Sequence, residues 1–315
     1  MILIISDLTD SRFNLAAEEF FLKESNEDFL MLYIDEPSVI VGKHQNTVAE
    51  VNLRYIIENN INVIRRISGG GTVYHDKGNL NFCFISNGKE GHLIDFEKYT
   101  SPITEILRNF GIKARLEGKN DLRVNGLKIS GNAEHVYKNR VPHHGTLLVS
   151  TDLTKLSEAL RVSNGIYTDN AVKSIRSKVA NLNELSNLPV NIEILKQQII
   201  EYFIKKYRFT IAGLTSNEIE SIKKLADKKY STWEWNFGYS PKYQFQNSFK
   251  NKGSGIKIFI EVENGIVTNA DIPGFGFLNL LLINVKHEYQ EIKKVLSNNL
   301  QLSSEEAKIL AWSFF

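Results

Sequence analysis

The feature that most restricts the fold of this chain is a series of short strand-like segments joined by short links. Each segment is a few residues long and mostly apolar, as is typical of strands. They are Met1–Ile5, Val39–Val41, Asn62–Ile67, Thr72–His75, Leu80–Ile85, Leu122–Val124, Leu127–Ser130 and Thr146–Ser150. Several links are too short for a parallel crossover, which needs about a dozen residues or more. We therefore expect an α+β fold with mixed or antiparallel sheets packed with helices.

Three stretches with helical signals are expected to accompany these strands. One follows Asp10, another opens at Ser101-Pro102 and ends before Gly111, and a third begins at Asn191. Their apolar positions recur at the spacing of one helix face. In the first and third stretches these positions are Phe13, Ala16, Ala17, Phe20, Phe21, Ile192, Leu195, Ile199 and Phe203.

The last part of the chain is expected to form a second, smaller α+β domain. Asn264-Gly265 is a favoured two-residue hairpin turn, and apolar strands flank it at 256–262 and 266–271. Two amphipathic helices follow, and Ser303 caps the second of them. The aromatic segment Trp233–Gln246 is expected to be an ordered loop that closes the larger domain. The predicted domains are residues 1–246 and 247–315.

Charge and cysteine content exclude several classes of protein. The chain has 38 Lys and Arg against 36 Asp and Glu, a net charge of +2, so we expect no nucleic-acid partner. The single cysteine, Cys83, permits no intramolecular disulfide and no Cys-rich metal site, so the cytoplasm is the expected compartment. Residues 277–285 form the longest late apolar run, which is too short to span a membrane. We expect a monomer.

The segment from Arg65 to Asp76 is the most unusual part of the chain. Two cations leave a strand and lead directly into Gly69-Gly70-Gly71 before the next strand begins. Glycines let the backbone approach a ligand, and exposed N–H groups with nearby guanidinium groups can bind an anion. The segment has neither G-x-G-x-x-G nor the Lys-Ser or Lys-Thr pair of a Walker A loop. A glycine-rich turn with a surface arginine pair is the alternative.

A second segment, Asn120 to Gly131, is predicted to be a hairpin around the Asn125-Gly126 turn. In that register Val124 faces Leu127, Arg123 faces Lys128, Leu122 faces Ile129 and Asp121 faces Ser130. Opposed cations on one face destabilise a ribbon, and a bound anion would relieve the repulsion. A hairpin whose basic residues point into water is the alternative.

Neither the histidine pair nor the cysteine indicates a separate site. His143-His144 precedes an apolar strand, where such a pair is more often turn-capping or packed than metal-binding, and we assign no metal to it. Cys83 lies in an apolar strand without an adjacent base, so we expect it to be buried and inert.

With these motifs in view, the chain resembles the lipoate-protein ligase A family. The family pattern R-R-x-x-G-G-G-x-V-[FY]-H-D is present at Arg65–Asp76, and N-D-L-x-V-N-G-x-K-I-S-G-N-A is present at Asn120–Ala133. Residues 143–148, the loop 173–182 and the segment 233–238 are also similar to the family. The resemblance covers nearly the whole chain and implies a catalytic domain followed by a C-terminal accessory domain.

The resemblance implies two half-reactions. Lipoate and ATP, with Mg²⁺, would give lipoyl-AMP and pyrophosphate, and the lipoyl group would then move to a lysine of an apo lipoyl domain. The implied acceptors are E2 subunits of 2-oxoacid dehydrogenases and the glycine cleavage H protein. A carboxylate must attack a polyanion in the first step, so cations and a divalent metal are needed to offset the charge.

The resemblance also implies roles for individual residues. Lys128 matches the family's lysine that touches both the carboxylate and the α-phosphate, and Asp121, from the family's Asn-Asp pair, is the candidate Mg²⁺ ligand. The residues implied to bind substrate or lipoyl-AMP are Arg66, Ser68, Gly69, Gly70, Gly71, Thr72, His75, Gly131, His144 and Gly145. Those implied to bind ATP are Tyr74, Asn120, Asp121, Lys128, Arg176 and Lys178.

Two other functions stay open on the sequence. An octanoyl or lipoyl amidotransferase of the same fold would need no ATP and would use a cysteine nucleophile, so Cys83 is the residue that separates the two enzymes. A non-catalytic lipoate- or adenylate-binding module would bind without releasing pyrophosphate.

Overall fold

The computed structural model describes residues 1–88, 93–161, 165–251, 254–300 and 302–315. By its internal contacts the chain divides into two compact units. The first unit contains residues 1–43, 62–157 and 175–231, and the second contains residues 44–61, 158–174 and 232–315. The domain boundary at residue 246 stays a prediction.

An eight-stranded mixed sheet organises the first unit, in the order β12-β1-β2-β6-β10-β9-β8-β7. The strands β12, β1 and β2 run parallel to one another, and the other pairs that connect β2 to β7 are antiparallel. This confirms the predicted α+β class with a mixed sheet. The strands are β1 Ile2–Ile5, β2 Phe29–Tyr33, β6 Asn79–Asn87, β7 Arg115–Glu117, β8 Asp121–Val124, β9 Leu127–Glu134, β10 Arg140–Leu148 and β12 Thr210–Ala212.

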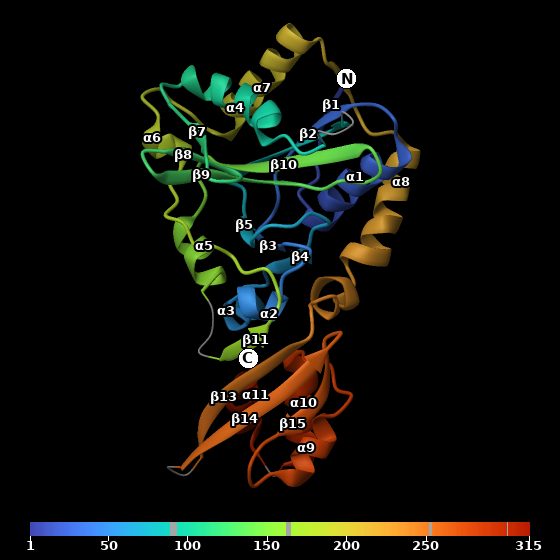
Figure 1. The fold of residues 1–315 in the computed structure, drawn as a ribbon, viewed down its shortest axis with the longest axis vertical. Helices are drawn as coiled ribbons and strands as arrows, with labels where there is room; N and C mark the ends of the chain where they lie inside the picture. The colour runs from blue at the N-terminus through green and yellow to red at the C-terminus, as the bar shows by residue number, and fades with distance from the viewer. Residues whose placement is uncertain (89–92, 162–164, 252–253, 301) are drawn as a thin grey trace. The chain divides into compact units, whose positions relative to one another are not determined.

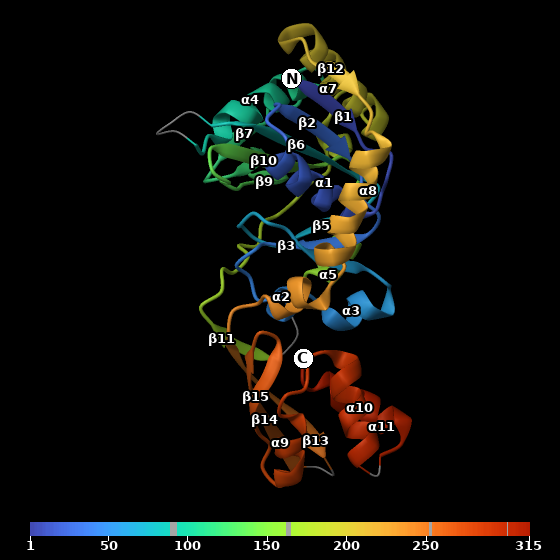
Figure 2. The same ribbon diagram turned by 90° about the vertical axis from the view of Figure 1, so that its right-hand side faces the viewer.

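Helices cover both faces of this sheet. α4 and α7 lie on one face (Figure 1), and α1 lies on the other (Figure 2). Buried side chains of α4 and α7, such as Ile106 and Ile199, share one apolar core with Phe82, Leu122 and Ile129 of the sheet. The helical segments of this unit are α1 Ser11–Glu24, α4 Phe96–Arg108, α6 Leu182–Leu185, α7 Ile192–Tyr207, α8 Ser216–Leu225 and the π-helical η1 Ala226–Tyr230, and α5 spans Leu153–Ala159.

A three-stranded sheet, β4-β3-β5, completes the first unit. It lies on the same side of the large sheet as α1, away from α4 and α7 (Figure 1). β3 spans Ser38–Val41, β4 spans Asn62–Arg65 and β5 spans Val73–His75. The glycine-rich segment therefore connects β4 to β5 and returns the chain along β3.

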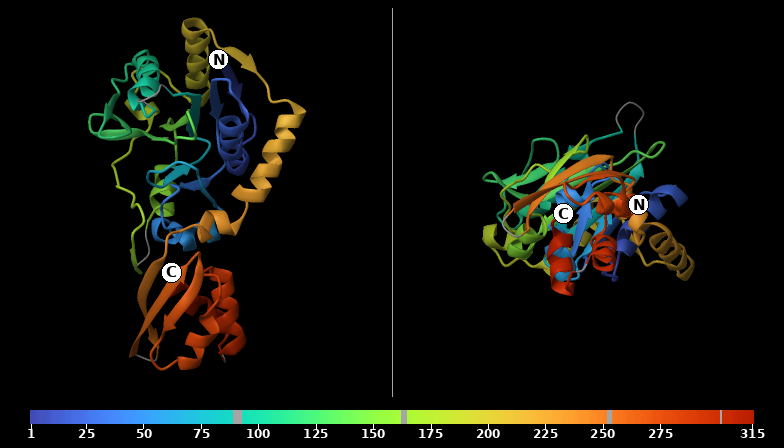
Figure 3. Two further views of the ribbon diagram at one scale, coloured as in Figure 1. Left: turned by 45° about the vertical axis from the view of Figure 1, so that its right-hand side comes forward. Right: turned by 90° about the horizontal axis from the view of Figure 1, so that it is seen from below.

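The second unit has its own sheet and its own core. The strands β11-β13-β14-β15 are antiparallel, and α9, α10 and α11 pack beside them (Figure 3). Asn264 and Gly265 both have positive φ, which confirms the predicted two-residue turn. The elements are α2 Thr47–Glu50, α3 Leu53–Glu58, β11 Ile166–Asp169, the π-helical η2 Glu234–Gly238, β13 Tyr243–Asn251, β14 Ser254–Glu263, β15 Ile266–Asp271, α9 Gly276–Leu282, α10 Tyr289–Asn299 and α11 Ser304–Trp312.

Three local predictions are wrong. α4 begins at Phe96 because Asp95 caps it, so Pro102 lies inside the helix rather than at its first position. β10 begins at Arg140, so the histidine pair lies within the strand rather than before it. Residues 233–246 contain η2 and the start of β13 rather than only a loop.

Candidate active site

Lys128 lies at the start of β9, next to the hairpin turn that joins β8 to β9. Asn125 and Gly126 both have positive φ, as a two-residue turn of this kind requires. Arg123 faces Lys128 as predicted. Beyond that pair the register shifts, and the predicted partners of Asp121 and Leu122 are wrong. Leu122 faces Ser130 and Asp121 faces Gly131, because a bulge adds one residue to the β9 side.

The bulge places the Asp121 carboxylate between two cations. One carboxylate oxygen lies 2.8 Å from Lys128 Nζ, and the other lies 2.6 Å from Arg123 Nη2. The repulsion between Arg123 and Lys128 is therefore offset by a carboxylate of the chain itself. Lys128 and Asp121 have 22% and 16% of their side-chain surface exposed, so a ligand has access to the pair.

A glycine makes room for the Lys128 side chain. A Cβ atom at Gly131 would lie 3.0 Å from Lys128 Nζ and 3.1 Å from its Cε, so the aliphatic end of the lysine crosses over this position. Gly145 is constrained by the core instead. A Cβ atom there would lie 2.3 Å from both Phe82 Cζ and Asn132 Oδ1.

The backbone of residues 178–180 runs beside Lys128. Lys128 N donates to the Lys178 carbonyl at 2.8 Å, and Ala180 N donates to the Lys128 carbonyl at 3.1 Å. Arg123 adds a hydrogen bond to Ser177 Oγ at 2.8 Å. The side chains of Arg176 and Lys178 are exposed on this loop. Two cations of the predicted ATP site are thus carried by a segment that is paired directly with Lys128.

Asn120 ties the start of β8 to β9. Its side-chain amide donates to the Asn132 carbonyl, and its own carbonyl accepts from Asn132 N at 3.0 Å. In this structure Asn120 therefore orients the hairpin.

The conformation of the glycine-rich loop is fixed by Arg66. Its Nη2 donates to the carbonyls of Gly69 and Gly71, its Nη1 to the Ile40 carbonyl and its Nε to Ser68 Oγ. Burial lowers the pKa of Arg66 to about 10, so the guanidinium stays charged near neutral pH. Arg65 is also buried, and it donates to the carbonyls at positions 42 and 43. The arginine pair is therefore internal, and the alternative of a surface pair is wrong.

The loop approaches the same face of the large sheet that carries Lys128. A Cβ atom at Gly70, whose φ is +87°, would lie 3.9 Å from Ala133 Cβ on β9. A Cβ atom at Gly69 would meet nothing within 4 Å. The two sequence motifs thus lie against one another, and the loop keeps open space at Gly69.

A buried polar chain connects the loop to helix α1. Ser68 Oγ lies 2.6 Å from His144 Nε2, and His144 Nδ1 lies 2.8 Å from the Glu18 carboxylate. The Tyr33 hydroxyl donates to the other Glu18 oxygen at 2.8 Å. Burial raises the pKa of Glu18, but His144 and Tyr33 outweigh it and hold that pKa below its ordinary value.

Cys83 adjoins this chain and is buried, as predicted. Burial and the nearby Glu18 carboxylate raise the pKa of its thiol well above the ordinary value. Donor atoms of Glu18, Cys83 and His144 lie within 4.8 Å of one another. Both Glu18 oxygens and both His144 nitrogens already have partners, so we assign no metal to the group.

His75 is paired with a carboxylate that the sequence analysis missed. Its Nδ1 lies 2.8 Å from Asp35, and Asn14 donates to the other Asp35 oxygen at 2.8 Å. His75 Nε2 is buried and has no hydrogen-bond partner among the described residues. Tyr74 is buried on the opposite side of β5, and Thr72 is largely buried.

Two acidic residues, Glu18 and Asp35, are the main omissions of the sequence analysis. Glu18 is a helical residue, and an acidic side chain on a helix is normally placed toward water. The sequence offered one signal that Glu18 is buried: it directly follows Ala17, which lies on the apolar stripe of the helix. Asp35 follows β2 without any motif around it.

Comparisons with known proteins identify relatives of this chain. Residues 10–204 match the family described as the lipoyl protein ligase A/B catalytic domain. The chain is 41% identical over 301 residues to lipoate–protein ligase 1 of Staphylococcus aureus, which covers 93% of this chain and 92% of the relative.

Solved structures of the same kind share the fold. The bipartite lipoate protein ligase of Thermoplasma acidophilum, described with its E2 lipoyl domain, is 29% identical, has a TM-score of 0.64 and covers 75% of this chain and 96% of its own. LipL1 of P. falciparum in complex with lipoate is 27% identical, has a TM-score of 0.64 and covers 98% of each chain. A lipoate-protein ligase A bound with ATP is 30% identical, has a TM-score of 0.63 and covers 75% of this chain and 98% of its own.

Proposed function

The chain belongs to the lipoyl protein ligase A/B family, and from this premise we propose how its residues attach lipoate to a protein. The chain is an ATP-dependent lipoate-protein ligase. A carboxylate oxygen of lipoate attacks the α-phosphorus of ATP, the bond from that phosphorus to the β-phosphate bridge breaks, and pyrophosphate leaves. The product is lipoyl-AMP, a mixed anhydride.

Lys128 is proposed to offset the repulsion between the lipoate carboxylate and the phosphates in this step. Its ammonium is partly exposed and lies over Gly131, and it is held by a single carboxylate, Asp121. We propose that Lys128 moves from Asp121 to the substrates and contacts both the lipoate carboxylate and the α-phosphate. A positioned charge of this kind commonly accelerates a reaction by about 100- to 1000-fold. The partly exposed Lys128–Asp121 ion pair beside Gly131 is the observation that supports the proposal most directly.

The glycine-rich loop and its neighbours are proposed to hold the lipoyl part of the substrate and its adenylate. Arg66 holds the loop through the carbonyls of Gly69 and Gly71. The remaining backbone groups of the three glycines are proposed to face the ligand. The residues proposed for this role are Arg66, Ser68, Gly69, Gly70, Gly71, Thr72, His75, Gly131, His144 and Gly145.

The nucleotide is proposed to lie along the segment paired with Lys128. Arg176 and Lys178 are exposed cations there, suited to the triphosphate or the adenylate. Tyr74, Asn120 and Asp121 complete the proposed ATP site.

Mg²⁺ is proposed to arrive with the triphosphate. Mg²⁺ in such sites takes one or two carboxylates together with phosphate oxygens and water. Asp121 fits as the protein ligand, since the oxygen that Lys128 would leave is the one that becomes free for an ion. The ion would supply positive charge against the phosphate oxygens.

The acceptor is proposed to be a lysine of an apo lipoyl domain, in E2 subunits and in the glycine cleavage H protein. The neutral amine attacks the lipoyl carbonyl, an amide C–N bond forms, the C–O bond to AMP breaks, and the amine loses a proton. A structural relative is described together with its E2 lipoyl domain, which supports this class of partner. We propose that the chain is a monomer in the cytoplasm. Among the described residues, no helix has the length and apolar character of a membrane span.

An omission experiment tests the function. The purified chain is incubated with ATP, Mg²⁺, lipoate and an apo lipoyl domain, and each component is left out in turn. We expect pyrophosphate release to need ATP and lipoate but not the acceptor, and the acceptor mass to rise by one lipoyl group only in the full mixture. Acceptor modification without ATP would contradict the proposal.

A further inference from the structure

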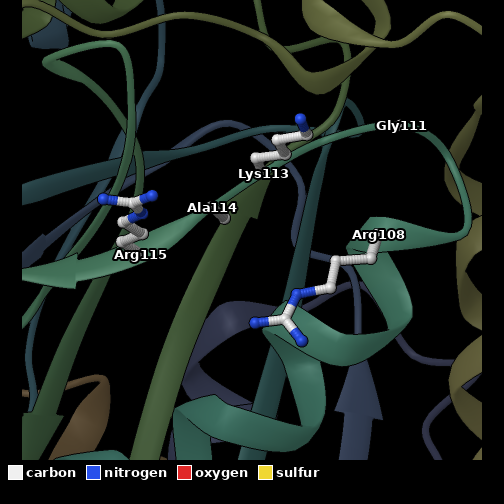
Figure 4. A pocket seen from close by; sticks show the side chains of 5 residues that line it. All are labelled: Arg108, Gly111, Lys113, Ala114 and Arg115. Carbon is white, nitrogen blue, oxygen red and sulfur yellow. The ribbon is translucent and has the colours of Figure 1, made fainter.

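A group of cations lies at the open edge of the large sheet, outside the residues assigned above. Arg108 is the last residue of α4. Lys113 lies just before β7, and Arg115 is the first residue of β7, which is the last strand of the sheet. We call these three residues the basic edge. With Gly111 and Ala114 they line a surface pocket of about 360 Å³, and none of its described lining residues is acidic (Figure 4).

The basic edge forms no salt bridge within the described part of the chain. No carboxylate there lies within ion-pair distance of Arg108, Lys113 or Arg115. The Glu105 carboxylate on α4 is held by Lys206 at 2.7 Å and by the Tyr202 hydroxyl at 2.6 Å, and these two groups lower its pKa more than Arg108 does. Three cations without a salt bridge among the described residues, in a chain with a net charge of only +2, mark a local surface for an anionic partner.

The sheet register connects this edge to the catalytic lysine. Arg115 faces Arg123 on β8, and Arg123 faces Lys128 on β9. Residues that face each other across a ladder project to the same side of the sheet, and neighbouring strands are about 4.8 Å apart. Arg115 is therefore about 10 Å from the Lys128 strand, measured across the sheet.

The spread of the charges indicates the size of the partner. In Figure 4 the side chains of Arg108, Lys113 and Arg115 point in different directions rather than toward one point. A small anion needs converging donors, whereas an acidic protein surface can meet separated charges one by one. A nucleic acid would need a longer basic tract than three residues.

We propose that the basic edge is the docking surface for an acidic face of the acceptor lipoyl domain. This inference rests on the proposed function and adds where the acceptor binds. The edge strand β7 is two strands from β9, which carries Lys128, so an acceptor held at that edge is on the part of the sheet that bears this lysine. The basic edge would thus raise the local concentration of acceptor without touching the reacting atoms.

The test compares two variants of the full chain with equal changes of charge. The test variant is Lys113→Glu with Arg115→Glu. The control is Lys223→Glu with Lys228→Glu, exposed residues of α8 and η1, which pack on α1 rather than at the β7 edge. Pyrophosphate release without acceptor is measured first, and then lipoyl transfer to an apo E2 lipoyl domain is measured over a range of acceptor and salt concentrations.

We expect the test variant to form lipoyl-AMP at a rate within about twofold of the unmodified chain, while its KM for the acceptor rises about 10-fold. The unmodified chain and the control should lose acceptor affinity with rising salt, and the test variant should lose little. Replacing acidic residues of the acceptor by lysine should restore transfer in the test variant.

Other results would overturn the inference. An unchanged KM for the acceptor would mean that the three cations are only solvated. An equal rise in the control would mean a nonspecific effect of net charge. If the unmodified chain releases no pyrophosphate with lipoate and ATP, the proposed function itself fails, and this outcome is visible before any acceptor is added.

Discussion

The ammonium of Lys128 lies 2.8 Å from the carboxylate of Asp121, and this ion pair sits on the glycine at position 131. The pair holds the ammonium that we propose to be catalytic while leaving 22% of the Lys128 side chain exposed. Neutralising Asp121 and removing Lys128 should therefore have different consequences.

Lys128→Ala should abolish useful adenylation. The charge acts on the phosphate oxygens and the attacking carboxylate, so we expect a fall of about 100- to 1000-fold in the rate of lipoate-dependent pyrophosphate release. Lys223→Ala, an exposed lysine of α8, is the control and should change the rate less than twofold. Near-normal adenylation by a folded Lys128→Ala variant would remove the role assigned to Lys128.

Asp121→Asn should alter the dependence on metal. If the carboxylate binds the ion that arrives with ATP, the Mg²⁺ concentration for half-maximal pyrophosphate release should rise about 10-fold. Glu117 faces Asp121 from the edge strand β7, so Glu117→Gln is a matched control on the neighbouring strand. If both variants need the same Mg²⁺ concentration for half-maximal pyrophosphate release, Asp121 forms only its ion pairs and does not bind the metal.

Gly131→Ala tests whether the position of the ammonium matters. The added methyl group meets the flexible end of Lys128, so the free energy of unfolding should change by less than about 1 kcal/mol. The displaced ammonium should slow adenylation about 10- to 100-fold.

Gly145→Ala provides the contrast to that substitution. The new methyl group would overlap Phe82 and Asn132, which have little room to move, so we expect destabilisation of about 2 kcal/mol or more. Thermal unfolding by circular dichroism separates the two variants. A stable, active Gly131→Ala variant would show that the lysine reaches its substrates from another position.

Cys83→Ser should retain ATP-dependent ligation. The thiol is fully buried, and burial with the nearby Glu18 carboxylate raises its pKa, so it has little thiolate character near neutral pH. We expect at least about half of the normal transfer rate, measured by acceptor mass. Complete loss of transfer in a folded variant would point instead to an amidotransferase with a cysteine nucleophile.

The part of the site within one hairpin could be predicted from the sequence. The part formed by segments far apart in the chain could not. The Asn125-Gly126 turn was sufficient to place Arg123 opposite Lys128. The bulge next to it was not predictable, because alternation of polar and apolar residues contains no mark for one added residue. That single residue places Asp121 opposite Gly131, and the Asp121 carboxylate lies between the two cations.

The contacts between motifs depend on tertiary packing in the same way. Ser68 and His144 are 76 positions apart, and Glu18 reaches His144 from a helix for which only the apolar positions were predicted. The predicted start of α4 was wrong for a related reason. Ser101-Pro102 has the signal of a first turn, but Asp95 caps the helix earlier, and the packing of Ile103 and Ile106 maintains it through the proline.

His287 should make the second unit less stable in mild acid. It is buried between the Tyr243 hydroxyl, 2.6 Å from Nδ1, and the Phe314 carbonyl, 2.6 Å from Nε2, an arrangement that suits a neutral ring. Burial lowers its pKa to about 4, against an ordinary value of about 6.5. Between these values the unfolded chain binds a proton that the folded chain does not bind. The stabilisation is therefore complete above about pH 6.5 and is lost as the pH falls toward 4, by about 3 kcal/mol.

Tryptophan fluorescence can follow this unit alone, because Trp233, Trp235 and Trp312 all belong to it. Urea unfolding of the full chain at several pH values between 4 and 7 gives the slope of unfolding free energy against pH. In His287→Gln the titrating group is absent, so the slope should be shallower even though the baseline stability also falls. Identical slopes in both proteins would mean that other groups cause the acid sensitivity. A shallower slope in the variant assigns it to the buried imidazole, since the same carboxylates titrate in both.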